Sequence, residues 1–266
     1  MTDIDQLLER LWEDYVQVNP QAEAVRDLLR SRGEDTVNDH LAFRTFDHPR
    51  IGIARMARPF LEAGYEPKSS YDFTEKKLAA QHFEHPDTSK PTVFISELEM
   101  AAFSPELGQV VEELVGQVTD RQMEASDFPV VGRPWPVSHA TYERLREESE
   151  YAAWLAAWGF RANHFTILVN SLRTIGSLEA LNALLEENGF VLNASGGKIK
   201  GTPHLLLEQS STMASQRPVQ FSDGCFTIPG CYYEFARRYP MPDGKLFKGF
   251  VTKSADRIFE STDKRS

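Results

Sequence analysis

The sequence repeats one pattern at an offset of 124 residues, the separation of His40 and His164. Residues 39–43 (DHLAF) align with residues 163–167 (NHFTI), so a histidine stands at the same place in both copies. The alignment then continues through two further glycines in each copy, with one inserted residue between them: Gly52 with Gly176, and Gly64 with Gly189. A repeat of this kind indicates two copies of one supersecondary unit.

In each copy the histidine opens a short apolar run, residues 40–46 in the first and 164–169 in the second. A turn and an amphipathic segment follow, and a glycine and an aromatic residue close that segment. This order predicts a strand, a helix with its C-cap, and a next strand. The matched histidines therefore begin the first strands of two units, and packing about a pseudo-twofold axis would bring both imidazoles to one point.

The rest of the chain is arranged around these copies, and we expect one catalytic domain over residues 1–266. Its predicted parts are N-terminal helices at 4–33, a first module at 38–100, a helical insertion at 104–159, a second module at 162–239 and a C-terminal tail at 240–266. Each module has a strand, a helix and three further strand candidates. The predicted fold class is α+β, with two βαβββ modules like those of the vicinal oxygen chelate fold forming an open barrel, an N-terminal helical cap and a helical insertion.

Composition excludes several functional classes. A net charge of −10 argues against a nucleic-acid surface, so we expect no nucleic-acid partner. No run of eighteen apolar residues is present, which argues against a membrane-spanning helix, and the acidic N-terminus indicates a cytoplasmic protein. The two cysteines, Cys225 and Cys231, are expected to be reduced thiols. The oligomeric state is left open.

The vicinal oxygen chelate pattern places metal ligands on the first strand of each module and on the last strand. In the second module the last strand contains Glu234 between apolar and aromatic neighbours, where a buried charge is costly unless it is paired or binds metal. Together with His40 and His164 it would form the two-histidine, one-carboxylate triad of non-haem Fe(II) oxygenases. The alternatives are that each histidine is an ordinary satisfied polar residue, and that Glu234 pairs with Arg237 or Arg238 or is simply exposed at an alternating strand position.

A fourth ligand would change the predicted chemistry. Glu97 and Glu99 stand at the end of the first module, where a symmetric site would place one more carboxylate. If either binds metal, the site resembles a four-ligand isomerase more closely than an oxygenase.

Three further residues are candidates for contact with the substrate. Arg44 lies four residues after His40, and on a strand these positions share a face. Its guanidinium can bind a carboxylate bidentately, so Arg44 is the candidate catalytic and substrate-binding residue for an acidic small molecule. Gln209 and Ser210, at the end of a strand in the second module, are expected to bind substrate as well, although they could equally form an ordinary polar strand end.

Three segments together resemble the 2-oxoadipate dioxygenase/decarboxylase family, whose members are also called 2-hydroxyglutarate synthases: residues 39–46 (DHLAFRTF), 206–214 (LLEQSSTMA) and 232–238 (YYEFARR). The resemblance implies an Fe(II) enzyme that converts 2-oxoadipate and O2 to D-2-hydroxyglutarate and CO2 in lysine breakdown. It implies a 2-oxo dicarboxylic acid and O2 as the small-molecule partners. The family's metal ligands match His40, His164 and Glu234, and its substrate-binding arginine matches Arg44.

Two other classes of function stay open at this point. A metal-dependent lyase, isomerase or hydrolase on the same fold would act without O2. A non-catalytic protein that binds a small ligand is also possible, but such a protein has no need of a buried metal triad. The sequence leaves open which 2-oxo acid is the substrate and which divalent transition metal is bound.

Overall fold

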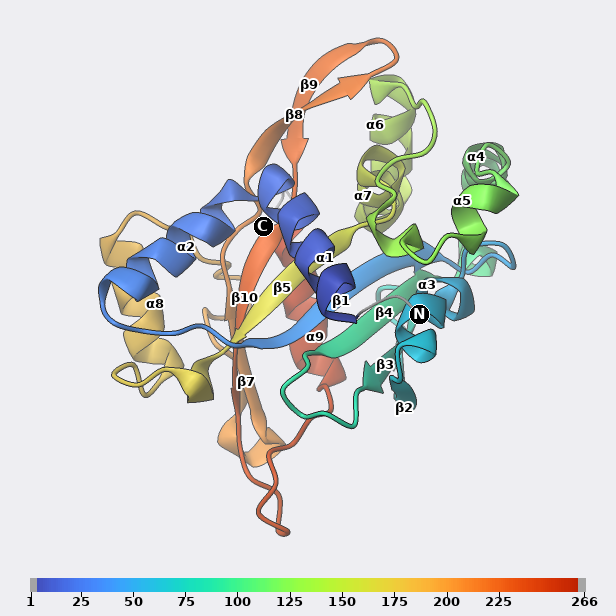
Figure 1. Cartoon of the computed structure of the whole chain (residues 1–266). Helices are drawn as coiled ribbons and strands as arrows, with labels where there is room; N and C mark the ends of the chain where they lie inside the picture. The colour runs from blue at the N-terminus through green and yellow to red at the C-terminus, as the bar shows by residue number, and fades with distance from the viewer. Residues whose placement is uncertain (1–3, 263–266) are drawn as a thin grey trace.

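A mixed eight-stranded sheet, curled into a half-barrel, forms the centre of the molecule (Figure 1). The computed structural model describes residues 4–262, so residues 1–3 and 263–266 of the predicted domain lie outside the described part. The strands of the sheet are β1 (Asn38–Phe46), β2 (Glu66–Phe73), β3 (Leu78–Glu84), β4 (Thr92–Leu98), β5 (Ala162–Leu168), β6 (Lys200–Thr202), β7 (Leu207–Ser211) and β10 (Tyr232–Arg238). Their order across the sheet is β2-β3-β4-β1-β5-β10-β7-β6.

This order is symmetric about the centre of the sheet. The two histidine strands, β1 and β5, pair antiparallel to each other, and each then pairs in parallel with the last strand of its own module, β4 or β10. The second half therefore mirrors the first, with β6, β7 and β10 in the places of β2, β3 and β4. The predicted α+β fold with two modules about a pseudo-twofold axis is confirmed.

The second module also contains a hairpin that the sequence pattern did not predict. Its strands, β8 (Gln216–Phe221) and β9 (Gly224–Pro229), pair only with each other. In Figure 1 the hairpin projects from the sheet beside the helices of the insertion. Each of its strands contains a proline, which disfavours a strand assignment from sequence, although the burial of residues along both strands alternates.

Four helices cover the outer face of the sheet: α1 (Ile4–Val18), α2 (Pro20–Ser31), α3 (Ile53–Glu62) and α8 (Leu178–Glu187). In α1 the buried residues Leu7, Leu11 and Tyr15 recur every four positions, which gives the helix one apolar face. Trp12 packs edge-on against Phe165 of β5, with ring centroids 5.2 Å apart. Phe165 alternates with His164, so these helices lie on the side of the sheet opposite the histidines.

The glycine and aromatic residue that close α3 and α8 form the same cap in both modules. Gly64 and Gly189 have φ angles of 101° and 83°, a left-handed conformation that glycine adopts without strain. The next residues, Tyr65 and Phe190, donate their backbone N–H groups at 3.0 Å to carbonyls five residues earlier. This is the hydrogen bond of a Schellman cap, and it explains why the repeat extends to these positions.

The last helix of the insertion and the helix of the C-terminal segment pack on the other side of the sheet, whereas the first part of the insertion contacts α3 and α1. The insertion folds as α4 (Pro105–Val115), α5 (Asp120–Glu124), α6 (His139–Glu148) and α7 (Glu150–Trp158). The last helix, α9 (Thr252–Phe259), contacts β2, β6 and β7, and it lies behind the sheet in Figure 1, whereas α1 lies in front. Within residues 4–262, no helix is long and apolar enough to cross a membrane.

A single glycine controls the turn from α7 into β5. Gly159 has φ 69° and ψ −151°, and a Cβ placed there would lie 2.2 Å from the carbonyl oxygen of Gly132. We expect Gly159→Ala to lower the free energy of unfolding by about 3 kcal/mol, because it adds backbone strain to a backbone clash. Urea unfolding measures the loss. Gly176→Ala is the control, since nothing lies within 4 Å of its Cβ, and equal unfolding midpoints for both variants would contradict the prediction.

Candidate metal centre

Three buried side chains from adjacent strands converge on the inner face of the sheet. They are His40 of β1, His164 of β5 and Glu234 of β10, and one ligand atom from each lies within 4.8 Å of the others. The two Glu234 oxygens face the two imidazoles separately. Oε1 is 3.5 Å from His40 Nε2, and Oε2 is 3.2 Å from His164 Nε2. The structure thus brings together the three residues that the repeat and the fold pattern selected.

The symmetric position in the first module holds no fourth ligand. Glu234 lies opposite the residue two positions after His164, and the residue two positions after His40 lies opposite Phe94 on β4. Phe94 is therefore the counterpart of Glu234. A phenyl ring cannot bind a metal ion, so among the described residues this centre offers a metal ion three candidate ligands and not four.

Glu97 and Glu99, the sequence candidates for that fourth ligand, lie elsewhere. Glu97 points to the opposite side of β4 from Phe94. Its Oε2 accepts the backbone N–H of Ile53, the first residue of α3 on the outer face, at 2.8 Å. Glu99 follows the end of β4. The expectation placed the fourth position too late in the strand, because the sequence did not show which residue of β4 pairs with β1 beside the histidine.

Each histidine is preceded by a bulged residue whose side chain supports it. Asp39 interrupts the pairing of β1 with β5, and Asn163 interrupts it from the other strand, so the repeat carries one bulge in each copy. Bulges redirect side chains. Asp39 Oδ2 lies 2.7 Å from Nδ1 of His40, and Asn163 Oδ1 lies 3.2 Å from Nδ1 of His164. With Nδ1–H donating to these oxygens, each Nε2 is left with a lone pair toward Glu234.

The electrostatic state of the three residues suits a cation. Burial, together with the charges of His40 and Arg44, holds the pKa of His164 well below its usual range, which favours the neutral imidazole that metals bind. Burial raises the pKa of Glu234, against the opposing influence of His40 and of a hydrogen bond from Gln209. The folded protein buries two imidazole nitrogens and a carboxylate together with little solvation. This set of ligand atoms fits a divalent transition metal ion.

Arg44 lies on the same face of β1 as His40, as predicted, with its side chain only 1% exposed. Its guanidinium lies over the rings of Tyr151 and Trp154 of α7, at 4.9 and 5.0 Å from their centroids. Nη2 donates to Thr262 Oγ1 at 3.0 Å, and Nη1 reaches Glu150 Oε1 at 3.3 Å. The insertion and the C-terminal segment together enclose this arginine.

Buried polar atoms without a partner gather on residues of this inner face. Within residues 4–262, six buried side-chain atoms have no hydrogen-bond partner, and three of them belong to this face: Arg44 Nε, Gln209 Oε1 and the Tyr232 hydroxyl. Tyr232 stacks on the His164 ring at 4.7 Å, and Gln209 Nε2 donates to Glu234 Oε1 at 2.5 Å. Unpaired buried donors and acceptors are costly, so their clustering indicates a place that receives a polar ligand.

The two polar residues predicted on β7 have different positions. Gln209 points to the triad, as its bond to Glu234 shows. Ser210 points the other way, and its hydroxyl donates to Asn182 of α8 at 2.8 Å on the outer face. Because neighbouring residues of a strand face opposite sides, only one of the pair can face the centre. We therefore leave Ser210 out of the residues proposed to bind substrate.

The C-terminal segment supplies site residues that the sequence reasoning missed. The Phe250 ring packs edge-on against the His40 ring, with centroids 4.8 Å apart, and at a tilt against the Phe94 ring, with centroids 4.7 Å apart. Thr262 accepts the bond from Arg44. Nothing in the repeat includes this segment, so the periodic signal could not find it. Tyr232 and Asp39, in contrast, stand directly beside the predicted motifs.

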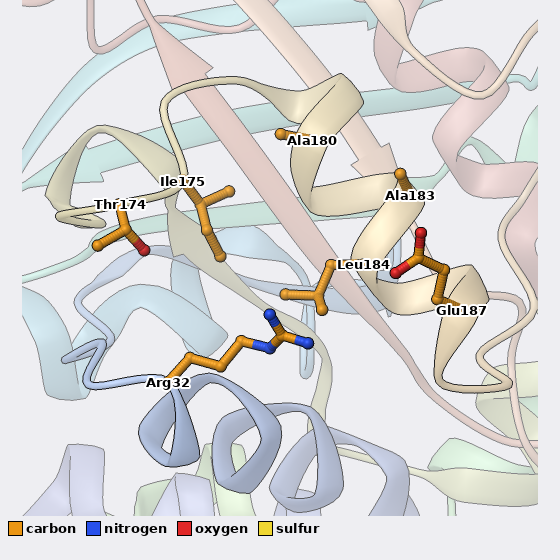
Figure 2. A pocket seen from close by; sticks show the side chains of 7 residues that line it. All are labelled: Arg32, Thr174, Ile175, Ala180, Ala183, Leu184 and Glu187. Carbon is orange, nitrogen blue, oxygen red and sulfur yellow. The ribbon is translucent and has the colours of Figure 1, made fainter.

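Two surface pockets lie apart from the triad. The pocket in Figure 2, of about 540 Å³, is lined on the outer face by Arg32 after α2, by the loop before α8 and by α8 itself: Arg32, Thr174, Ile175, Ala180, Ala183, Leu184 and Glu187. A second pocket of about 680 Å³ lies between α3 and the first module's strands and includes Glu97. Neither contains a residue of the triad.

Comparison with protein families gives a consistent match. The family model for 2-oxoadipate dioxygenase/decarboxylase matches residues 2–127 and 124–247. The curated 2-oxoadipate dioxygenase/decarboxylase of Arabidopsis thaliana is 36% identical over 276 residues, covering 93% of this chain and 74% of the relative.

Two solved structures are closely similar. The hydroxyglutarate synthase of Oryza sativa, determined in complex with 2-oxoadipate, is 32% identical with a TM-score of 0.89, and the match covers 98% of this chain and 92% of that one. A Shewanella frigidimarina NCIMB 400 protein, provisionally described as a hydrolase, is 48% identical with a TM-score of 0.90, covering 95% of this chain and 99% of that one.

Proposed function

The chain belongs to the 2-oxoadipate dioxygenase/decarboxylase family, and we propose that it converts 2-oxoadipate and O2 to D-2-hydroxyglutarate and CO2. The observation that carries this proposal is the buried triad of His40, His164 and Glu234 with Arg44 on the same inner face. The atoms balance, because one carbon leaves as CO2 and both atoms of O2 stay in the products. We propose Fe(II) as the metal.

The metal would be held by one nitrogen of each histidine and by the Glu234 carboxylate. A bound Fe(II) ion supplies Lewis acidity and electron-transfer chemistry with O2 at the positions that three protein ligands leave free. Phe250 and Phe94 pack as apolar rings beside His40, where they would keep bulk water from the metal. The protein residues thus fix the metal and exclude solvent.

Arg44 would hold the far carboxylate of the substrate. Its Nε–H is unpartnered and shares an edge of the guanidinium with Nη2, which has a second N–H besides the one that Thr262 accepts, so this edge can offer two donors to a carboxylate. The rings of Tyr151 and Trp154 fix the guanidinium in place. The Tyr232 hydroxyl and the second N–H of Gln209 Nε2 would donate to the oxygens at the other end of the 2-oxo acid.

An oxygen-electrode assay tests the proposal. Protein reconstituted anaerobically with Fe(II) is mixed with aerated buffer and 2-oxoadipate, with 2-oxoglutarate and 4-hydroxyphenylpyruvate as comparisons. We expect O2 uptake and CO2 release in equal amounts with 2-oxoadipate, and D-2-hydroxyglutarate as the product. Metal-dependent turnover of any substrate without O2 uptake would instead favour a hydrolase or lyase. Iron binding without turnover of any oxo acid would contradict the proposed reaction.

A further inference from the structure

The two histidines of the triad occupy equivalent positions, but the groups behind them differ. The acceptor behind His40 is the carboxylate of Asp39, and the acceptor behind His164 is the neutral amide of Asn163. The carboxylate contact is also shorter, 2.7 Å against 3.2 Å. The repeat therefore preserves the bulge and the hydrogen bond while changing the charge.

Arg238, at the end of β10, neutralises the buried carboxylate of Asp39. Its Nε donates to Asp39 Oδ1 at 2.6 Å and its Nη2 to Asp39 Oδ2 at 2.8 Å, which is the bidentate geometry of a strong pair. Both side chains are almost fully buried, at 3% and 4% exposure. Asp39 Oδ2 is thus shared by Arg238 and by His40, in an unbroken chain of contacts from the arginine to the imidazole.

The same arginine also holds the C-terminal segment against the centre. Its Nη1 donates to the backbone carbonyls of Phe247 and Gly249, at 2.8 and 2.9 Å. The next residue, Phe250, places its ring edge-on to His40. Arg238 therefore fixes the His40 ring both through Asp39 and through the segment that packs on it. The described residues show no corresponding arginine at Asn163, whose Nδ2 has no partner.

We propose that Arg238 and Asp39 are positioning residues that make His40 the more strongly electron-donating of the two imidazole ligands. A carboxylate that accepts the Nδ1–H of a ligating histidine fixes the ring's orientation and raises its basicity, and loss of such a partner weakens metal binding by about 10- to 100-fold. A more basic ligand stabilises the higher oxidation state of iron and lowers the midpoint potential. The inference rests on the proposed metal site but not on the identity of the substrate.

Asp39→Asn is the sharpest test, because it gives His40 the same amide that Asn163 gives His164. Two quantities are measured without substrate: the Fe(II) dissociation constant, by anaerobic competition with a chelator, and the Fe(III)/Fe(II) midpoint potential. We expect the dissociation constant to rise by about 10-fold or more and the potential to become more positive. Asn163→Ala is the matched control at the other histidine, and its effect on the potential should be smaller.

Unchanged affinity and potential in Asp39→Asn, or a shift no larger than that of Asn163→Ala, would overturn the proposal. If Asp39→Asn does not yield folded protein, Arg238→Lys replaces it, since lysine keeps the charge but loses the bidentate contact. The same two quantities are then expected to shift in the same direction, and unchanged values would again overturn the proposal. Because no oxo acid is present, failure of the proposed reaction would be seen separately in the O2 assay.

Discussion

Replacing Glu234 by glutamine is expected to reduce Fe(II) affinity by at least about 100-fold, and turnover with it, without lowering the stability of the metal-free protein. Burial raises the pKa of this carboxyl, so folding disfavours its charged form. The charge consequently costs stability in the metal-free protein as the pH rises above the carboxyl's unfolded pKa, and a neutral amide removes that cost. Anaerobic iron titration and thermal unfolding of the metal-free variant measure the two effects.

Glu34 provides the control, because it is a carboxylate with little exposed surface and a structural role, although it lies nearer the surface of the protein than Glu234. It accepts backbone N–H groups of Arg173 and Thr174 at 2.6 and 2.7 Å, and a hydrogen bond from the Thr174 side chain is the main cause of its lowered pKa. Glu34→Gln should therefore lower the unfolding midpoint and leave iron affinity unchanged. If Glu234→Gln behaved in the same way, Glu234 would be a structural residue and not a metal ligand.

Replacing Arg44 by alanine is expected to lower kcat/KM for 2-oxoadipate by about 100-fold, which corresponds to the loss of about 3 kcal/mol of charge-assisted hydrogen bonding. Iron affinity should stay near that of the wild type, because Arg44 is not a ligand. The partner that it leaves, Glu150, has a side chain that is 21% exposed and can be hydrated. Steady-state kinetics and iron titration check both statements.

The choice of substrate shows what Arg44 recognises. 2-Oxohexanoate has the same chain length as 2-oxoadipate but lacks the distal carboxylate, so Arg44→Ala should change its kcat/KM by much less. Arg44→Lys keeps the charge but not the two-pronged geometry, and its activity should fall between those of the wild type and the alanine variant. An equal loss for both substrates would show that Arg44 does not bind the distal carboxylate.

The repeat was enough to predict the centre of the fold, because matched positions in two copies of the sequence occupy matched positions in two copies of the structure. A histidine, a helix and a glycine cap at matched positions require two equivalent units, and equivalent units pack about an axis. The ligand Glu234 followed from a different signal, a charged residue within an aromatic strand. These inferences succeeded because the alternation of a strand and the cap of a helix depend on neighbours in the sequence.

The repeat pattern could not predict which residues of neighbouring strands pair with each other. The sequence could not show that Phe94, and not Glu97, faces the site from β4, because one residue of register decides which side chains point inward. For the same reason it could not separate Gln209 from Ser210. The hairpin of β8 and β9 was missed because each of its strands contains a proline, which weakens the strand signal in the sequence.

By itself, the sequence determined that two βα units present His40 and His164 at equivalent points, with Glu234 and Arg44 near them. Only the tertiary structure decided what stands behind these residues. Arg238 lies 199 positions from the Asp39 that it holds, and Thr262 lies 218 positions from Arg44. Such contacts are fixed by the register of β10 and by the docking of the C-terminal segment. Local periodicity in the sequence cannot predict these contacts, because they form only when distant segments of the chain come together in the folded protein.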